Sequence, residues 1–222
     1  MDLNSNIAID GPAGAGKSTV AKLVARKLGY TYIDTGAMYR AVALQALNDG
    51  VSLNDVSGLV RSAKDAVLNI KTNPGGKMRV FLHGEDVTEQ IRAPEVSRAV
   101  SLVAKIPEIR KQLITMQKTM ALKGGVVMEG RDIGTAVLPE AKVKVFLYAT
   151  PKERAKRRRE ELAQQGCFVG SSEMEAEISE RDRIDSSRKI NPLVQAPDAA
   201  FIDCSFLTVE QVVNIILEKV RQ

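Results

Sequence analysis

The chain has 222 residues, of which 44% are hydrophobic and 27% charged, and its formal net charge is +5. This length is enough for one or two domains and for a core that needs no disulfide or metal to hold it. A single histidine and two cysteines exclude zinc bound by cysteine and histidine, and they fit free thiols in a reducing compartment. The N-terminus lacks the features of a signal peptide and no apolar run could span a membrane, so we expect a cytoplasmic protein without a membrane partner.

The positive charge favours anionic ligands, although by itself it does not separate nucleotides from nucleic acid. Only 4% of the residues are aromatic and there is no tryptophan. The chain therefore has few aromatic side chains on which the bases of a single strand could stack. We expect no nucleic-acid partner.

Five short apolar runs predict strands, at residues 6–10, 31–34, 126–129, 143–149 and 200–203. Segments of helical periodicity separate most of them, and the clearest predicted helices cover residues 17–28, 37–47 and 208–221. Apolar strands that alternate with helices are typical of a parallel sheet covered on both faces. The pattern therefore predicts an α/β fold.

Two segments interrupt this alternation. Residues 68–73 and 78–82 read as a hairpin around Pro74, Gly75 and Gly76, which predicts a small mixed α/β subdomain at about 51–105. A polar segment at about 151–193 is rich in arginine and glutamate, so we expect helices that project from the body and move. The rest, about 1–50, 106–150 and 194–222, would form the core of one domain.

Residues 11–18 follow the phosphate-binding loop pattern: glycine, four residues, glycine, lysine, serine. They are Gly11, Pro12, Ala13, Gly14, Ala15, Gly16, Lys17 and Ser18. A predicted strand precedes them and a predicted helix follows. In such a loop the backbone amides surround phosphate, the lysine reaches the β and γ phosphates, and the serine hydroxyl binds Mg²⁺. The pattern predicts a site for a nucleoside triphosphate, with Ser18 as a metal ligand.

Other users of such a loop fit less well. A GTP switch should carry Asn-Lys-x-Asp for guanine, and no asparagine here is followed by lysine. Residues 55–58 match the short Asp-x-x-Gly motif, which we interpret as chance on a helix surface. Motor, transporter and helicase ATPases need longer chains. A small phosphotransferase remains.

Arginines are placed where such an enzyme needs them. Arg40 follows the second predicted strand, and Arg131 and Asp132 follow the third, at the edge where open α/β sheets bind ligands. A basic helical face opens the polar segment, and acidic and basic residues recur across its far side: Arg154, Arg157, Arg158 and Arg159, then Arg181, Asp182, Asp185 and Arg188. A solvated helix laced with glutamates is the alternative interpretation of the polar segment.

Phosphoryl transfer between two anions depends mainly on positioning and charge compensation. A phosphate monoester acceptor has a second pKa of about 6, so its oxygen is already a nucleophile near neutral pH. Such a reaction needs no general base, whereas a kinase for an alcohol more often needs a placed carboxylate. The many arginines, without an obvious activated base, favour a phosphate acceptor.

Several motifs together resemble the bacterial cytidylate kinases over essentially the whole chain. They are the start at 9–12 with the loop through Thr19, and the segments 34–40, 84–88, 130–134 and 180–182. The resemblance implies a five-stranded parallel core, a monophosphate-binding insertion, a helical lid, and transfer from ATP with Mg²⁺ to CMP or dCMP. We expect a monomer.

The resemblance also assigns roles by position. The loop through Thr19 would bind ATP, and the cytosine edge would be read by Ser101, Arg110 and Asp132. The acceptor phosphate and sugar would be held by Thr35, Tyr39, Arg40, Arg131, Arg181, Asp185 and Arg188. The catalytic set would be Lys17, Arg131, Arg181 and, closing from the lid, Arg154 and Arg158. Some relatives have glycine at Ser18, and relatives often have serine at Thr35.

Alternatives from other classes remain. A nucleotide-dependent binding switch would bind guanine nucleotides with negligible turnover. An RNA-binding module is disfavoured by the acidic residues among the arginines. Among enzymes, the alternative is a kinase for another small acceptor such as uridylate.

Overall fold

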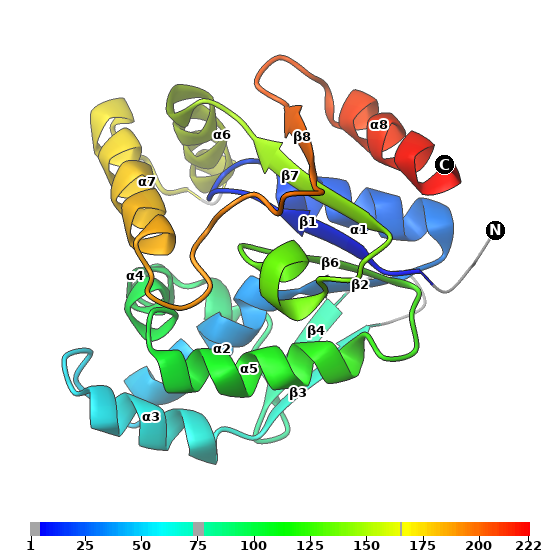
Figure 1. The fold of residues 1–222 in the computed structure, drawn as a ribbon. Helices are drawn as coiled ribbons and strands as arrows, with labels where there is room; N and C mark the ends of the chain where they lie inside the picture. Colours follow the sequence, from blue (N-terminus) through cyan, green and yellow to red (C-terminus); the bar gives the residue numbers. More distant parts are fainter. Residues whose placement is uncertain (1–4, 73–77, 165) are drawn as a thin grey trace.

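The computed structural model describes residues 5–72, 78–164 and 166–222 (Figure 1). Within these residues, a parallel five-stranded sheet in the order β2-β6-β1-β7-β8 forms the centre. Its strands are β1 Ile7–Asp10, β2 Thr31–Asp34, β6 Val126–Gly130, β7 Val143–Tyr148 and β8 Ala200–Asp203. All five lie within a residue or two of the predicted bounds. The predicted α/β fold is confirmed.

Helices cover both faces of this sheet (Figure 1). On one face α1 packs with α8 over the central strands, and on the other lie α5 and the short π-helix η2. The bounds are α1 Lys17–Leu28, α2 Thr35–Asn48, α5 Pro107–Met120, η2 Ile133–Val137 and α8 Val209–Arg221. The last helix buries one apolar face through Val212, Val213, Ile216 and Val220, whereas Val209 in its first turn is exposed.

Caps determine where these helices begin and end. Gly29 adopts a left-handed conformation directly after α1, as expected for a glycine C-cap. α2 begins two residues earlier than predicted, because the Asp34 side chain accepts a hydrogen bond from the Ala37 backbone at 3.1 Å. Thr208 and Gln211 form a capping box at the start of α8.

An insertion between α2 and α5 builds a second layer against α2. It contains α3 Val56–Asp65, β3 Leu68–Thr72, β4 Met78–Leu82, β5 Glu85–Asp86, the 3₁₀ turn η1 Gln90–Arg92 and α4 Pro94–Val103. The two predicted hairpin strands are present as β3 and β4, and the predicted turn at Pro74–Gly76 lies outside the described residues. Asp55 caps α3 by accepting a hydrogen bond from the Gly58 backbone at 2.9 Å, so the Asp-x-x-Gly match is a helix cap.

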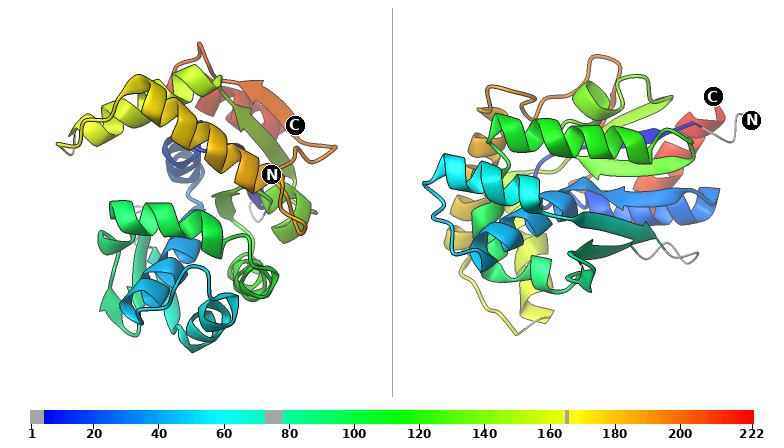
Figure 2. Two further views of the ribbon diagram at one scale, coloured as in Figure 1. Left: turned by 90° about the vertical axis from the view of Figure 1, so that its left-hand side faces the viewer. Right: turned by 90° about the horizontal axis from the view of Figure 1, so that it is seen from below.

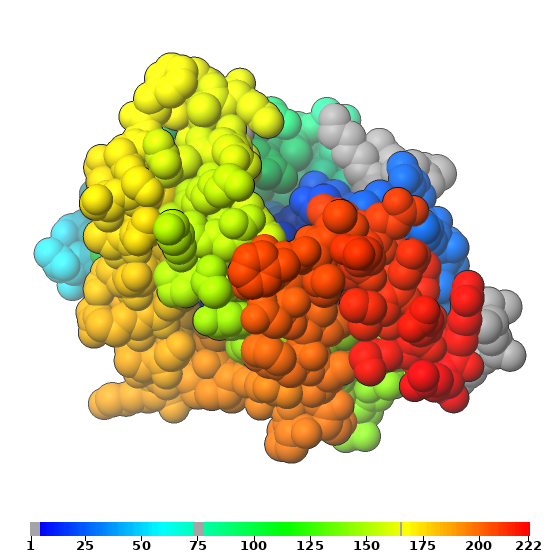
Figure 3. All heavy atoms as spheres, turned by 90° about the horizontal axis from the view of Figure 1, so that it is seen from above, coloured from blue at the N-terminus to red at the C-terminus, as the bar shows by residue number. Residues whose placement is uncertain are grey.

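Two helices, α6 Pro151–Gln164 and α7 Ser171–Ser186, run side by side at one end of the molecule. They share a small apolar contact of Ala155, Met174 and Ile178. In the space-filling view they form a lobe beside the C-terminal segment (Figure 3). Viewed from the end, this pair lies across from the insertion, with the start of α1 between them (Figure 2). In the described part of the chain, no helix is long and apolar enough to cross a membrane.

Candidate active site

A cavity of about 760 Å³ lies at the carboxyl ends of the central strands, between the α6–α7 pair and α4. It is lined by every residue expected to bind the acceptor: Thr35, Tyr39, Arg40, Ser101, Arg110, Arg131, Asp132, Arg181, Asp185 and Arg188. The phosphate-binding loop lines its other end from Ala13 to Thr19. The structure therefore gathers residues from five separate parts of the sequence around one space.

The phosphate-binding loop follows β1 and ends on α1, as predicted. Gly11 has a φ of +145°, and a Cβ there would lie 2.0 Å from the Leu147 carbonyl oxygen, so only glycine fits. Gly11 and Pro12 do not line the cavity. The Lys17 ammonium donates to the Pro12 carbonyl oxygen at 2.7 Å and is almost fully buried. Burial and the neighbouring Arg131 lower the pKa of Lys17 to about 7.

Arg154 was expected to close over the transferred group, but the structure places its side chain elsewhere. Its guanidinium is 2% exposed, and it donates to the carbonyl oxygens of Ala149 at 2.9 Å and Ala13 at 3.0 Å. It also pairs with Asp182 at 2.7 Å. Because Arg154 lies in the first turn of α6, directly after β7, it reaches the underside of the phosphate-binding loop. In this structure it ties the loop to the α6–α7 pair and does not line the cavity.

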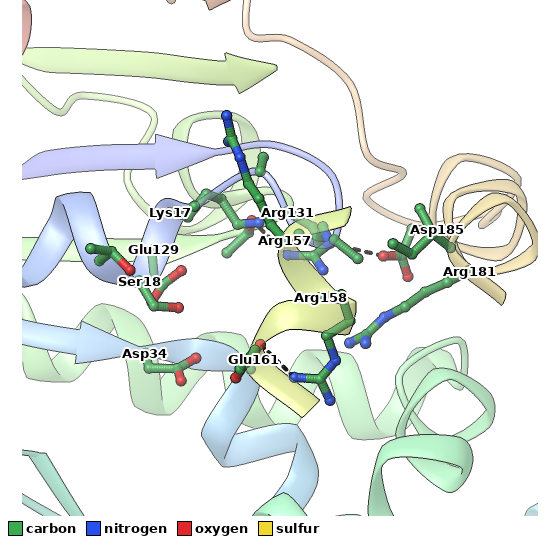
Figure 4. A pocket seen from close by; sticks show the side chains of 18 of the residues that line it. Lys17, Ser18, Asp34, Glu129, Arg131, Arg157, Arg158, Glu161, Arg181 and Asp185 are labelled. Carbon is green, nitrogen blue, oxygen red and sulfur yellow. Dashed lines mark hydrogen bonds and ion pairs between the residues drawn. The ribbon is translucent and has the colours of Figure 1, made fainter. Parts of the chain in front are cut away.

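Arg157 and Arg158 do line the cavity from α6 (Figure 4). Arg157 donates to the Cys204 carbonyl oxygen at 2.8 Å and to Glu153 at 3.0 Å, one helical turn away. Arg158 pairs with Glu161 at 2.7 Å. Arg158 therefore lies in the lining of the cavity, and its role over the transferred group stays a prediction. Arg157 was predicted only as part of a basic face, and the contact with Cys204 that places it depends on the fold.

Asp185 organises the arginines at the acceptor end. Its carboxylate is 2% exposed and pairs with Arg131 at 2.8 Å and with Arg188. Burial alone would raise the pKa of Asp185, but Arg131, Arg188 and Arg181 together lower it below its usual value. The carboxylate is therefore ionised, and it holds two of the arginines in place.

Arg181 projects from α7 toward the same cavity (Figure 4). Burial, together with the charges of Arg131 and Arg40, lowers the pKa of Arg181 to about 9. Within the described chain, the buried Nε atoms of Arg181 and Arg188 have no hydrogen-bond partner. A cluster of guanidinium groups that lowers the pKa of Arg181 and leaves buried donors free is suited to a multiply charged anion.

Arg110 and Asp132 form a buried ion pair in the lining of the cavity. Arg110 is 1% exposed, and it also donates to the Ala104 carbonyl oxygen at 3.0 Å. Its guanidinium lies 5.5 Å from the centre of the Tyr39 ring. The Nε of Arg110 has no partner among the described residues. A polar pair of this kind suits the hydrogen-bonding edge of a base.

Two carboxylates beside Ser18 were not among the predicted site residues. Asp34 and Glu129 end neighbouring strands and line the cavity (Figure 4). Burial and the charge of Asp34 raise the pKa of Glu129, which accepts a hydrogen bond from the Tyr32 hydroxyl. The tertiary structure brings both carboxylates beside the phosphate-binding loop, and that the acceptor needs no general base stays a prediction. Acidic residues ending predicted strands were the signal available in the sequence.

The donor set around Ser18 fits a hard divalent cation, since hydroxyl and carboxylate oxygens are the ligands that Mg²⁺ prefers. No group of three or more histidine, cysteine, aspartate or glutamate side chains in the described residues could hold a metal ion.

The family model for cytidylate kinase matches residues 7–222. The chain belongs to the cytidylate kinase family. It is 61% identical over 220 residues to the cytidylate kinase of Pelotomaculum thermopropionicum, covering 99% of this chain and 97% of the relative. It is 49% identical to the cytidylate kinase of Bacillus subtilis, and the match covers 100% of this chain and 99% of the relative. As a cytidylate kinase family member, it is an ATP-dependent nucleoside monophosphate kinase.

Solved structures support the fold. A shikimate kinase from Bacteroides thetaiotaomicron matches with a TM-score of 0.50 at 15% identity, covering 98% of this chain and 99% of that one. A protein from Eubacterium ventriosum matches with a TM-score of 0.52 at 14% identity and 98% coverage of both chains. The core of this cytidylate kinase family member is thus that of a phosphate-binding-loop kinase.

Proposed function

We propose that this chain transfers the γ-phosphoryl group of ATP to CMP or dCMP, giving ADP and CDP or dCDP. The observation that carries the proposal is a single cavity with two different ends. One end is the phosphate-binding loop, and the other combines clustered arginines with the buried Arg110–Asp132 pair. ATP and a nucleoside monophosphate bound at these ends would meet between them.

In the transfer, an oxygen of the acceptor phosphate forms a bond to the γ phosphorus, and the bond from that phosphorus to the β–γ bridging oxygen breaks. The acceptor oxygen needs no base, because its phosphate is largely a dianion at neutral pH. Lys17, Arg131, Arg158 and Arg181 would compensate the charge that gathers on the transferring group. Arg154 would act through the loop that it holds.

Mg²⁺ would be held by Ser18, with Asp34 and Glu129 nearby, and when bound it would neutralise charge on the donor phosphates. The carboxylates of Asp34 and Glu129 would then lie beside the metal ion. This assignment explains why acidic residues line a site that otherwise attracts anions.

Base recognition would fall to Asp132, Arg110 and Ser101. Cytosine offers an exocyclic amine to the carboxylate and acceptors at its ring nitrogen and carbonyl to the guanidinium. Because the two side chains already pair with each other, they are held ready before the base binds.

The proposal extends to the organisation of the chain. Residues about 51–105 would bind the monophosphate and about 151–193 would act as a lid, around one core. The enzyme would work as a cytoplasmic monomer on small nucleotides, since one chain provides both ends of the cavity. Nucleic acid is not expected as a partner.

A coupled assay of ADP release tests the function, with ATP, Mg²⁺ and a panel of CMP, dCMP, UMP, AMP and GMP. We expect the highest kcat/KM with CMP and dCMP. A higher value with UMP would favour the uridylate alternative, and guanine nucleotide binding without turnover would favour a switch.

A further inference from the structure

Asp10 ends β1 directly before the phosphate-binding loop, and no step of the reaction above uses it. Its side chain is 4% exposed. Its carboxylate accepts two consecutive backbone hydrogen bonds, Oδ1 from the Ile133 amide at 2.8 Å and Oδ2 from the Gly134 amide at 2.7 Å. Burying a charged carboxylate costs more than burying a neutral side chain, so a specific reason for its presence is expected.

The segment that Asp10 holds carries two of the acceptor-binding side chains. Arg131 and Asp132 immediately precede Ile133, and both line the cavity. At the start of the same segment, the Thr35 hydroxyl donates to the Glu129 carbonyl oxygen at 2.7 Å. The segment is thus held from α2 at one end and from β1 at the other.

The phosphate-binding loop has anchors of its own. Arg154 donates to the Ala13 carbonyl oxygen at 3.0 Å, and the Cys204 thiol donates to that of Ala15 at 3.3 Å. These contacts do not involve the Asp10 carboxylate. Loss of this carboxylate should therefore disturb the acceptor side of the cavity more than the ATP side.

We propose that Asp10 is a positioning residue that fixes Arg131 and Asp132 relative to the phosphate-binding loop, and thereby sets acceptor affinity and base selectivity. It acts through the backbone of the segment after β6 and touches neither nucleotide. The inference rests on the proposed function for the identity of the acceptor.

The same contact makes acceptor binding depend on pH. Burial raises the pKa of Asp10 to about 6; Asp132 adds to the rise, and the two amides and Lys17 oppose it. Lys144 on β7 is another charged side chain beside Gly134. A Cβ built on Gly134 would lie 3.3 Å from the Cδ of Lys144 and 3.4 Å from Oδ2 of Asp10. Protonation of the Asp10 carboxylate replaces one hydrogen-bond acceptor with an O–H group. The hydrogen bonds from Ile133 and Gly134 to Asp10 therefore weaken as the pH falls through about 6.

The test compares Asp10→Asn with the wild-type enzyme, with Asp203→Asn as the matched control. Asparagine keeps the size and one acceptor but turns an amide donor toward the other backbone amide. Asp203 also accepts a backbone hydrogen bond, from the Ser205 amide at 2.9 Å, and it lies at the end of β8 outside the lining of the cavity. For Asp10→Asn we expect KM for CMP to rise about tenfold, the order of one lost hydrogen bond. KM for ATP should stay within about twofold, and the preference for CMP over UMP should narrow severalfold. Asp203→Asn should change none of these values.

The pH profile separates positioning from a general loss of structure. CMP itself titrates near pH 6, but the ratio of variant to wild-type KM for CMP cancels the titration of the substrate. This ratio should be largest above pH 7 and approach one below pH 6. In the wild-type protein, the NMR shifts of the Ile133 and Gly134 amide protons should titrate together with a midpoint near 6, which requires no variant.

Equal rises in KM for ATP and CMP, or a lowered Tm with unchanged KM values, would overturn the proposal. Ile133 and Gly134 amide shifts that do not titrate between pH 4 and 8 would remove its pH dependence. Failure of the wild-type enzyme to phosphorylate CMP in the same assay would instead contradict the proposed function. In that event the acceptor found in the panel replaces CMP in the comparison.

Discussion

Lys17 occupies the first position of α1, almost fully buried, with its ammonium against the loop carbonyl of Pro12. A phosphate chain would replace that carbonyl contact with a charged one. Lys17→Ala should lower kcat by at least about 100-fold, as for other charge contacts to a transferring group, while the circular dichroism spectrum stays unchanged. Lys27→Ala, in the exposed last turn of the same helix, is the control and should remain active. Unchanged turnover in Lys17→Ala would contradict the phosphate-binding assignment.

Arg131 lines the cavity and pairs with Asp185 at 2.8 Å. Arg131→Ala should cost about 2–4 kcal/mol in kcat/KM, by comparison with the loss of one charged oxyanion contact. Its removal also leaves Asp185 with fewer partners, which adds to the cost. Steady-state kinetics with CMP measure the loss, and Arg183→Ala, an exposed arginine of α7, is the control. A rate within threefold of wild type would show that Arg131 serves only as a partner of Asp185 and does not contact the transferring group.

Asp132 is the residue that we propose for the choice of base, and it pairs with Arg110. Uracil presents a carbonyl where cytosine has its amine, so an ionised Asp132 faces like polarity and Arg110 loses an acceptor. Each buried polar group left unpaired costs about 1–3 kcal/mol. Wild type should favour CMP over UMP by about ten- to several hundredfold in kcat/KM, and Asp132→Ala should narrow this ratio by reducing CMP use far more. An equal loss of kcat/KM with CMP and UMP would mean that Asp132 supports the phosphate-binding arginines or the metal ion, and not the contact with the base.

At the scale of elements, the α6–α7 pair holds together through a small apolar contact. Phe168 between the two helices is 86% exposed, and three arginines of the pair, Arg157, Arg158 and Arg181, line the cavity. Those arginines gain further partners only when phosphate is present, and closure would exclude water from the transferring group.

We therefore expect hydrogen exchange across residues 151–193 to slow when a bisubstrate analogue binds, one in which adenosine and cytidine are joined by a polyphosphate chain. Mass spectrometry of exchange with and without the analogue measures the change, and α3, which does not line the cavity, is the internal reference. Equal protection in both states would mean that α6 and α7 form a rigid pair.

For the whole molecule, Asp10 links the site to stability. Its pKa is about 6 in the folded protein against 3.8 as the ordinary value, so the folded state binds more protons between these two pH values. Stability from this group is therefore fully present below pH 3.8 and is lost as the pH rises to about 6.

Urea unfolding of wild type and Asp10→Asn between pH 4.5 and 7.5 tests this linkage. Their difference in free energy of unfolding should shift by about 2 kcal/mol in favour of the variant as the pH rises, at about 1.4 kcal/mol per pKa unit. The comparison removes the contribution of all groups that the two proteins share. A difference that does not change with pH would mean that the pKa of Asp10 is close to its ordinary value.

Local patterns in the sequence were enough to locate the core strands, the first helix and the phosphate-binding loop. Each core strand was an apolar run bounded by turn residues, and α1 ended at a glycine, so β1, β2 and α1 could be located from the chain alone. The loop at 11–18 was visible because its chemistry depends on consecutive residues. The acceptor-binding residues came from the resemblance to a family, because their positions are scattered along the chain.

Contacts between distant segments were decided only by the tertiary structure. Asp10 and Gly134 are 124 positions apart, and Cys204 and Ala15 are 189 apart, so no periodicity could pair them. Arg154 and Arg158 share a helical face, yet one lies beneath the loop and the other in the cavity. Helical spacing determines which side chains point the same way, whereas the packing of α6 against β7 and the loop determines what each one meets. The sheet order, which no local pattern encodes, sets all of these distances.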